Sequence, residues 1–286
     1  MNTKTMTVGQ ALVEFLSQQY TVDGDECERT IPGMFGIFGH GNVAGIGQAL
    51  REAHSEDPNR MPYYQARNEQ AMVHQSVGFA RMRRRRSTFA STASVGPGAA
   101  NMLTGAALAT SNRMPVLLLP SDTFATRVSD PVLQQLELPH DTGIQVTDAF
   151  RPLSRYFDRV QRPEQLYSIA LAAMRVLTDP VETGAVTIAL PEDVQAEKLD
   201  VPLEFLQRRE WHVRRPLPER LPERRKPAGA PSNGITRSTS VVSARRDQRR
   251  PTGLRPKPTS LSESARATAI SLPRAARHSA TRACAS

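Results

Sequence analysis

Residues 63–101 read YYQARNEQAMVHQSVGFARMRRRRSTFASTASVGPGAAN. Asn68 is a good N-cap, and the residues after it have the spacing of a helix that we expect to run to about Arg86. A strand over residues 87–94 follows, and Pro97 and Gly98 break it into a second helix. The stretch therefore predicts a helix–strand–helix unit of a parallel α/β layer.

The same alternation extends over residues 1–215. Helices are expected over residues 7–19, 44–54, 99–110 and 164–177, and strands over residues 33–38, 115–120 and 185–190. Thr7 is the expected N-cap of the first helix. The predicted fold is α/β, with a parallel sheet covered by helices on both faces.

Charge is divided unevenly between residues 1–215 and residues 216–286. The first segment contains 22 Lys and Arg against 24 Asp and Glu, a net charge of −2. The second contains 15 basic and 4 acidic residues, so the +9 of the whole chain arises there. The basic balance therefore says nothing about the partners of the first 215 residues.

Residues 216–286 also differ in composition. They contain 9 prolines, 10 serines and 13 arginines, and no Phe, Trp or Tyr. Such a segment buries too little apolar surface to offset the entropy of ordering, so we expect a disordered basic tail. Two interpretations stay open: a natural low-complexity tail that could contact nucleic acid, or a frameshift product, which the aperiodic Arg/Pro/Ala/Ser mixture favours.

Few features of the sequence indicate a compartment. Cys27 and Cys284 lie at opposite ends without metal-ligand spacing, so a reducing, cytoplasmic setting is the default expectation. No basic segment followed by an apolar one opens the chain, and we expect no secretory signal. The longest aliphatic run, residues 116–119, is too short to cross a bilayer.

Glu69 is the strongest candidate for a catalytic residue. A carboxylate in the first turn of a helix, beside an Asn cap, is usually a favourable charge at the positive end of the helix dipole. The functional alternative is a buried carboxylate that faces a nitrogen heterocycle. Position supports this alternative, because α/β sheets bind ligands where helices begin beside the carboxyl ends of strands.

Two glycine-rich turns accompany Glu69. Gly96, Pro97 and Gly98 can form an ordinary strand-to-helix turn, and residues 39–42 (GHGN) an ordinary loop. Neither turn has the spacing of a dinucleotide or P-loop motif. Their order along the chain is more informative than either turn alone.

In this order the turn near residue 40, the helix start at Asn68 and Glu69, and the loop at residues 94–101 resemble thiamine diphosphate enzymes of the acetolactate synthase type. Several phrases are similar to one branch, the trihydroxycyclohexane-1,2-dione hydrolases of inositol catabolism. They are residues 35–45 (FGIFGHGNVAG), 62–64 (PYY), 131–135 (PVLQQ), 150–159 (FRPLSRYFDR) and 190–196 (LPEDVQA). The resemblance covers residues 7 to about 215.

The resemblance implies a pyrimidine-binding domain. The family uses thiamine diphosphate and magnesium to open the ring of a cyclic vicinal diketone, giving 5-deoxy-glucuronate. By the family pattern Glu69 hydrogen-bonds the pyrimidine ring and favours its imino form. Gly96, Pro97 and Gly98 would shape the loop against the pyrimidine, and Asn101 would stabilise it.

The resemblance also implies a pocket wall. Tyr63, Tyr64, Gln65 and His40 are its candidates, and His40 is expected to touch cofactor or substrate as readily as to cap its own loop. His74 is expected to be a packed or surface histidine. The arginine run at residues 83–86 is expected to be a solvated helix end.

The chain departs from the family at its second half. Family members continue into a domain whose Gly-Asp-Gly motif and later asparagine hold Mg²⁺ and the diphosphate. This sequence has no Gly-Asp-Gly, and residues 216–286 contain one asparagine, Asn233, with acids isolated among arginines. Because a Mg²⁺ site needs clustered oxygen ligands, we expect no metal ligands here. The resemblance therefore implies a truncated enzyme that is inactive alone and needs a homo-oligomer or a full-length homologue to complete its site.

Three alternatives stay open. An acetolactate synthase-like enzyme would use the same cofactor. A non-catalytic binding module would keep the fold and not need Glu69. A nucleic-acid-binding protein would owe a salt-sensitive affinity to the basic tail.

Overall fold

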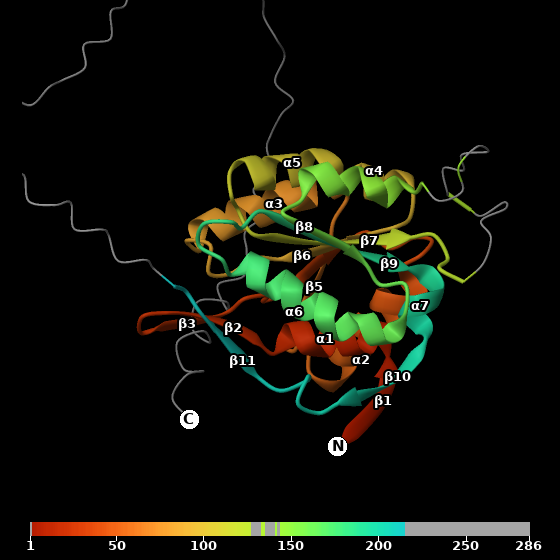
Figure 1. The fold of residues 1–286 in the computed structure, drawn as a ribbon, viewed down its shortest axis with the longest axis horizontal. Helices are drawn as coiled ribbons and strands as arrows, with labels where there is room; N and C mark the ends of the chain where they lie inside the picture. The colour runs from red at the N-terminus through yellow and green to blue at the C-terminus, as the bar shows by residue number, and fades with distance from the viewer. Residues whose placement is uncertain (1, 127–132, 135–140, 142–143, 215–286) are drawn as a thin grey trace, which may run out of the picture. The chain divides into compact units, whose positions relative to one another are not determined.

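The computed structural model describes residues 2–126, 133–134, 141 and 144–214. The expected tail and the expected domain boundary at residue 215 lie outside the described residues. The described chain forms a six-stranded sheet in the order β5-β4-β6-β7-β9-β8, with helices on both faces (Figure 1). All of its adjacent strands are parallel. The predicted α/β class is confirmed.

The strands of this sheet are short at one side and long at its centre. They are β4 (Met34–Gly36), β5 (Tyr63–Gln65), β6 (Ala90–Ala93), β7 (Val116–Asp122), β8 (Tyr156–Arg159) and β9 (Ala185–Pro191). β7 and β9 are buried along their whole length. A strand covered on both faces needs apolar side chains at every position, which is why these two segments read as continuous apolar runs.

Two layers of helices enclose the sheet. One layer contains α1 (Val8–Ser17), α2 (Gln48–Glu56) and α6 (Leu166–Leu177), and the other contains α3 (Glu69–Met82), α4 (Pro97–Ala100) and α5 (Leu103–Ser111) (Figure 1). Shorter elements are the π-helix η1 (Val43–Gly47), the 3₁₀-helices η2 (Val146–Leu153) and η3 (Pro163–Gln165), and α7 (Glu192–Ala196). The buried apolar side chains form two clusters, one under each layer.

Thr7 caps α1 as the sequence predicts. Its hydroxyl accepts a hydrogen bond from the Gln10 backbone N–H at 3.2 Å, and the Gln10 side chain accepts one from the Thr7 N–H at 2.7 Å. This reciprocal capping box satisfies two donors that the first turn of a helix otherwise leaves unpaired.

Two small sheets were not predicted. β1 (Thr3–Thr7) pairs with β10 (Lys198–Pro202) in antiparallel fashion, and β11 (Arg209–His212) lies parallel to β2 (Gln19–Asp23), which pairs with β3 (Glu26–Arg29). The β1–β10 and β2–β11 pairs join segments almost 200 residues apart in the sequence, so no local pattern indicates them, whereas β2 and β3 form a local hairpin around Gly24.

The helix that begins at Asn68 is shorter than predicted. It ends at Met82, and Arg84 and Arg85 adopt left-handed backbone conformations with φ of 54° and 67°. The Arg85 N–H closes the helix by donating to the Ala80 carbonyl at 2.8 Å.

The prediction that residues 83–86 form a solvated helix end is wrong for Arg83 and Arg86. Arg83 pairs with Glu28 at 2.5 Å, and Arg86 pairs with Glu28 at 2.7 Å and with Glu26. The β2–β3 hairpin brings these glutamates to the helix end, and Glu28 is buried there. Distant acidic residues therefore neutralise part of the run.

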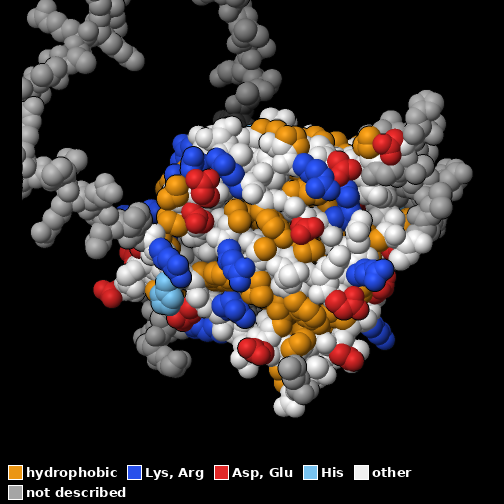
Figure 2. Space-filling view, viewed as in Figure 1, with side chains coloured by type: hydrophobic (Ala, Val, Ile, Leu, Met, Phe, Trp, Pro, Cys, Tyr) orange, Lys and Arg blue, Asp and Glu red, His pale blue; other side chains and the backbone are white. Residues whose placement is uncertain are grey.

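The face that carries α6 has no large field of one sign. Acidic, basic and apolar side chains are interspersed on it (Figure 2), in line with the small net charge of residues 1–215. Among the described residues no helix is both long and apolar enough to span a membrane.

Candidate functional site

The sheet has a topological switch point between β4 and β6. The chain passes from β4 to β5 on one side of β4 and then returns to place β6 on its other side. In open α/β sheets ligands bind beyond the carboxyl ends of the strands at such a point. Here those ends lead into the loops at residues 37–42 and 94–98, which contain most of the predicted site residues.

Glu69 begins α3 beside these loops and is half-buried. Asn68 caps the helix through its side-chain oxygen, which accepts from the Ala71 N–H at 2.9 Å. The Asn101 side-chain amide donates to Glu69 Oε2 at 2.7 Å. Asn101 thus holds one carboxylate oxygen directly, a contact across 32 residues of sequence.

Gly98 lies against the other oxygen of Glu69. A Cβ at Gly98 would stand 3.4 Å from Glu69 Oε1 and would overlap the Ser94 hydroxyl. A side chain at this position would therefore fill the space in front of the carboxylate. The absence of a side chain at Gly98 leaves an open space bordered by Ser94 and Glu69.

Gly96 has a backbone that an L-residue rarely adopts, with φ of 68°. A Cβ here would overlap the carbonyl oxygen of Gln134. Pro97 then occupies the first turn of α4, where its missing N–H costs nothing. Gly96 is required both by its φ and by the close approach of Gln134.

The turn that contains His40 is tied to the loop after β6. The Val95 N–H donates to the His40 carbonyl at 3.0 Å, and a Cβ on Gly39 would stand 2.8 Å from Ser94 Cβ. Asn42 fixes the turn, because its side-chain oxygen accepts from the Gly39 N–H at 2.9 Å. The predicted residues at 39–42, 69 and 94–101 thus lie in one continuous cluster.

The imidazole of His40 contacts an acidic residue from a third loop. Its Nε2 lies 3.2 Å from Glu192 Oε2, at the start of α7. Gln195, on the same short helix, donates to the Gly41 carbonyl at 2.7 Å and accepts from the Ile46 N–H at 3.2 Å. These contacts from α7 therefore hold the turn that contains His40 in position.

The three residues proposed as a pocket wall with His40 lie on the edge strand β5. The Tyr63 hydroxyl donates to the Gly36 carbonyl at 3.0 Å, and burial raises the pKa of Tyr63. Tyr64 packs edge-on against Phe89, and Gln65 is exposed. Tyr63 also stacks on Phe38, in the loop that follows β4, with ring centroids 4.9 Å apart. His74 bonds the Gln70 amide at 3.2 Å along α3.

A buried ionic cluster lies at the end of β7. Asp122 is 2% exposed and accepts from Arg159 Nε at 2.5 Å and from the Thr147 hydroxyl at 2.7 Å. Asp148 also accepts from Arg159, at 3.2 Å. Because of Asp122 and Asp148 the pKa of Arg159 is raised despite the opposing effect of its burial. The cluster fixes the described stems on either side of residues 127–143.

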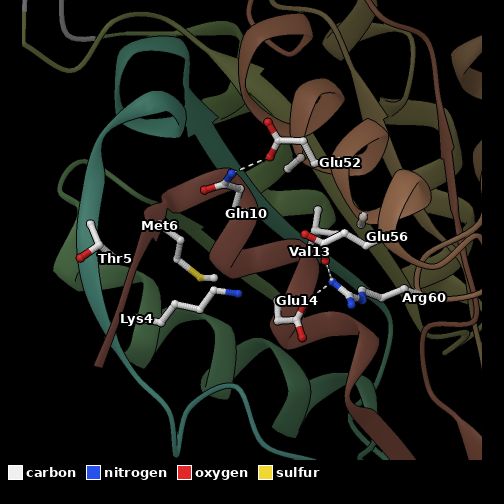
Figure 3. Close-up of a pocket in the computed structure, with 11 residues that line it drawn as sticks. Lys4, Thr5, Met6, Gln10, Val13, Glu14, Glu52, Glu56 and Arg60 are labelled. Atoms are coloured by element: carbon white, nitrogen blue, oxygen red, sulfur yellow. Dashed lines mark hydrogen bonds and ion pairs between the residues drawn. The ribbon is translucent and has the colours of Figure 1, made fainter. Parts of the chain in front are cut away.

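A concavity of about 170 Å³ lies elsewhere, between β1, α1 and α2 (Figure 3). Its charged side chains mostly satisfy one another. Arg60 pairs with Glu14 at 3.2 Å and with Glu56 at 2.5 Å. The Gln10 amide donates to Glu52 at 2.5 Å, and hydrogen bonds from Gln10 and Gln48 lower the pKa of Glu52. These pairings, and its place away from the switch point, make it the weaker candidate.

Sequence reasoning assigned no individual role to several residues of the cluster. Asn42 and Ser94 lie in the two loops that the sequence singled out, whereas Glu192 and Gln195 have no distinctive local pattern. Glu192 and Gln195 follow a buried strand within the phrase LPEDVQA, which was the available signal. Among the described residues no group of three or more His, Cys, Asp or Glu side chains is arranged to hold a metal ion.

Comparison with known proteins defines the class. Residues 6–142 match the family described as "Thiamine pyrophosphate enzyme, N-terminal TPP binding domain". This range contains β4, α3, β6 and the cluster around Glu69. The folded unit therefore carries the N-terminal TPP-binding domain of thiamine pyrophosphate enzymes.

Curated relatives make the relationship more specific. The chain is 55% identical over 218 residues to the "3D-(3,5/4)-trihydroxycyclohexane-1,2-dione hydrolase" of Geobacillus thermodenitrificans (strain NG80-2), covering 76% of this chain and 34% of the relative. It is 54% identical over 218 residues to the proteins of that name from Bacillus thuringiensis (strain Al Hakam) and Bacillus cereus (strain 03BB102), covering 76% of this chain and 33% of each. The chain thus spans about a third of the length of these relatives.

Proposed function

We propose that residues 1–215 form the pyrimidine side of a thiamine diphosphate site and that the complete enzyme hydrolyses a C–C bond of a cyclic 1,2-dione. The open space beside Glu69 Oε1 is the observation that supports this proposal most directly. Asn101 holds Oε2, while Gly98 keeps the space before Oε1 open. That arrangement fits a planar nitrogen heterocycle placed against the carboxylate.

The chemistry required of the chain is positioning and proton exchange. When bound, thiamine diphosphate supplies the nucleophilic carbon that the reaction needs. Glu69 would hydrogen-bond the pyrimidine ring nitrogen and share its proton, as a half-buried carboxylate with one oxygen already occupied can do. Asn101 would hold the carboxylate in the required rotamer. Gly96, Pro97 and Gly98 would line the ring, with His40 at the edge of the same cluster.

The substrate assignment rests on the relatives. Their name gives a trihydroxycyclohexane-1,2-dione as the compound hydrolysed. The resemblance implies a role in inositol catabolism, and the cysteine usage favours a cytoplasmic setting. We propose the same substrate for the complete enzyme. The diphosphate and Mg²⁺ would be bound by groups outside residues 1–215, so that residues 1–215 alone would have little activity.

A binding experiment tests the role of Glu69. Thiamine diphosphate is titrated into the full chain, and saturation-transfer NMR reports which of its protons approach the protein. We expect contact with the pyrimidine protons, and weaker binding by about tenfold in Glu69→Gln, because a hydrogen bond to a charged group is lost. Glu164→Gln, which changes an exposed first-turn glutamate of η3, is the matched control.

The outcome also separates an enzyme from a binding module. Equal affinities of the wild type and Glu69→Gln would remove Glu69 from the site and favour a non-catalytic module. A second assay mixes the chain with a full-length relative in which the corresponding glutamate is inactivated. Ring opening that depends on Glu69 is expected; absence of product would contradict function in a shared site.

A further inference from the structure

The amino edge of the sheet, opposite the cluster around Glu69, carries a basic patch. We define this arginine patch as Arg81, Met82, Arg84, Arg85, Arg113 and Val181. It lies where α3 and α5 end and where the loop between α6 and β9 returns to the sheet.

The members of the patch are held together by side-chain contacts. Arg81 donates to the Asn112 side chain at 3.4 Å, and Arg85 donates to the Pro180 carbonyl at 3.2 Å. Arg113 donates to the Val181 carbonyl. Three segments that are distant in sequence therefore form one surface.

The backbone of this surface is unusual. Four non-glycine residues of the described chain have positive φ, and three of them are Arg84, Arg85 and Arg113, with φ of 54°, 67° and 50°. They follow the ends of α3 and α5, where helices commonly place glycine because Cβ crowds the carbonyl in a left-handed conformation. Such strained residues cluster at functional surfaces. The sequence therefore maintains guanidinium groups at positions that glycine would occupy with less strain.

The favourable interaction of a positive charge with the end of α3 does not by itself explain why arginines occupy these left-handed positions. Arg81 already lies in the last turn of α3 with helical backbone, and Arg83 binds Glu28 at the same end. Either position complements the helix dipole without strain. Within the described residues no carboxylate pairs with Arg84 or Arg85, and both are exposed. Their charges are available to a partner.

The net charge of the region is positive. The patch and its neighbour Arg155 contribute five arginines. Glu182 lies 3.3 Å from Arg113 and 3.4 Å from Arg155, and the Asp179 carboxylate is occupied by the backbone N–H groups of Val181 and Glu182 at 2.7 Å. Two acids against five arginines leave a charge of about +3, which attracts an anionic partner.

Apolar side chains narrow the class of partner. Met82 is 82% exposed and Val181 is 51% exposed. A methionine at a surface adapts to apolar side chains of differing shape. A single-stranded nucleic acid would instead favour aromatic rings for stacking, and the patch has none. We propose that the arginine patch is a docking site for an acidic segment of a partner protein that also carries apolar side chains.

The proposal goes beyond the proposed function and does not depend on it, because the patch lies at the opposite edge of the sheet from Glu69. It is tested on the full chain with a defined probe, a short peptide of alternating glutamate and leucine that carries a central photo-crosslinking group. Binding is measured by fluorescence anisotropy, and the crosslinked residues are identified by mass spectrometry. Mapping is needed because the arginine-rich residues 216–286 also attract an acidic peptide.

Two charge-matched variants isolate the patch. Arg84→Gln with Arg85→Gln removes two of its charges, whereas Arg51→Gln with Arg67→Gln removes two exposed charges elsewhere. We expect the first pair to weaken binding about fivefold and the second to leave it within about twofold. Crosslinks are expected in residues 79–86, 111–114 and 178–183.

A third variant separates charge from folding. Arg84→Gly with Arg85→Gly suits the left-handed backbone, so a fall in binding without a fall in melting temperature would support docking through the guanidinium groups. Crosslinks confined to residues 216–286, or equal losses in both Gln pairs, would overturn the proposal. So would a single-stranded oligonucleotide that binds the patch more tightly than the peptide.

Discussion

Both edges of the parallel sheet contain residues with left-handed backbone conformations, but the types of residue differ between the two edges. At the carboxyl edge, left-handed conformations fall on Gly41 and Gly96, with φ of 98° and 68°, and also on Gln134, with φ of 62°, which lies against Gly96. At the amino edge they fall on Arg84, Arg85 and Arg113. Both edges contain turns between helices and strands, so turn geometry alone does not explain the choice.

The two edges differ in how much space the surrounding atoms leave for a side chain. At the carboxyl edge a Cβ on Gly96 would overlap the Gln134 carbonyl, and one on Gly98 would fill the space before Glu69. Arg84 and Arg85 are instead exposed, and Arg85 contacts the Pro180 carbonyl at the surface. Glycine is therefore kept where the backbone itself forms a site, and a strained side chain is kept where its charge is used.

The largest effect is expected at the ionic cluster that supports the carboxyl edge. Arg159→Met leaves Asp122 buried without its partner, which costs about 3–5 kcal/mol of unfolding free energy. Arg151 also contacts Asp148 but is 57% exposed. Arg151→Met should therefore cost less than about 1 kcal/mol. Urea unfolding of both variants measures the contrast, and similar losses would show that Asp122 is not buried as the structure places it.

A pair of glycine-to-alanine substitutions tests whether the glycine at the carboxyl edge is required. Gly96→Ala combines an unfavourable φ with the overlap at Gln134, and we expect a loss of about 2–3 kcal/mol. Gly78→Ala lies inside α3, where a new Cβ meets nothing within 4 Å. It should stabilise the chain by about 0.8 kcal/mol, because alanine favours helix. Equal effects on denaturant midpoints would mean that Gly96 is not constrained.

At the amino edge a glycine should improve stability. Arg84→Gly removes the left-handed strain, and we expect a gain of about 1 kcal/mol. Arg83→Gly is the contrasting variant, because Arg83 has φ of −88° and binds Glu28. It should destabilise the chain. Thermal melts of the two adjacent variants check the opposite signs; a loss of stability in Arg84→Gly would indicate an unrecognised contact of that side chain.

The smallest expected effect concerns acid stability near the end of β7. Burial alone would raise the pKa of Asp193, but hydrogen bonds from Thr126 and from the N–H groups of Ala125 and Val194 outweigh it and hold the pKa below its usual range. A depressed folded-state pKa contributes stability that is complete above the unfolded value of about 3.9 and is lost as pH falls through the folded value.

Since Asp193 is only half-buried and solvent screens its interactions, this contribution should stay below about 1 kcal/mol. Unfolding measured from neutral pH to below the unfolded pKa should show a smaller loss of stability in Asp193→Asn than in the wild type. Parallel curves for the two proteins would remove Asp193 from the acid response.

Much of the fold was readable from local patterns. The Thr7 and Asn68 caps and the apolar runs of β7 and β9 use interactions within a few residues or burial on both faces, and both leave periodic signals. Element ends were less accessible. The helix expected to reach Arg86 ends at Met82, because the backbone turns so that Arg83 and Arg86 reach Glu28 and Glu26 on a distant hairpin.

The candidate site likewise has features that the sequence indicated and features that it could not indicate. The order of Glu69 and the glycine turns indicated a thiamine diphosphate domain, and the comparisons confirm that class. Roles of Glu69, Gly96, Pro97, Gly98, Asn101 and His40 remain predictions that the binding experiment addresses. The contacts of His40 with Glu192 and of Gly41 with Gln195 could not be predicted, since each spans about 150 residues.

The sequence by itself located the main helices and the strands β4, β6, β7 and β9, and it identified the residue that carries the candidate carboxylate. Those properties follow from caps, periodicity and backbone preferences that act within one or two turns. Only the tertiary structure decided that Asn101 occupies one oxygen of Glu69 while Gly98 leaves the other open, and that arginines at the ends of α3 and α5 share one surface. Such arrangements depend on the packing of helices around the sheet, which brings together groups that have no local reason to meet.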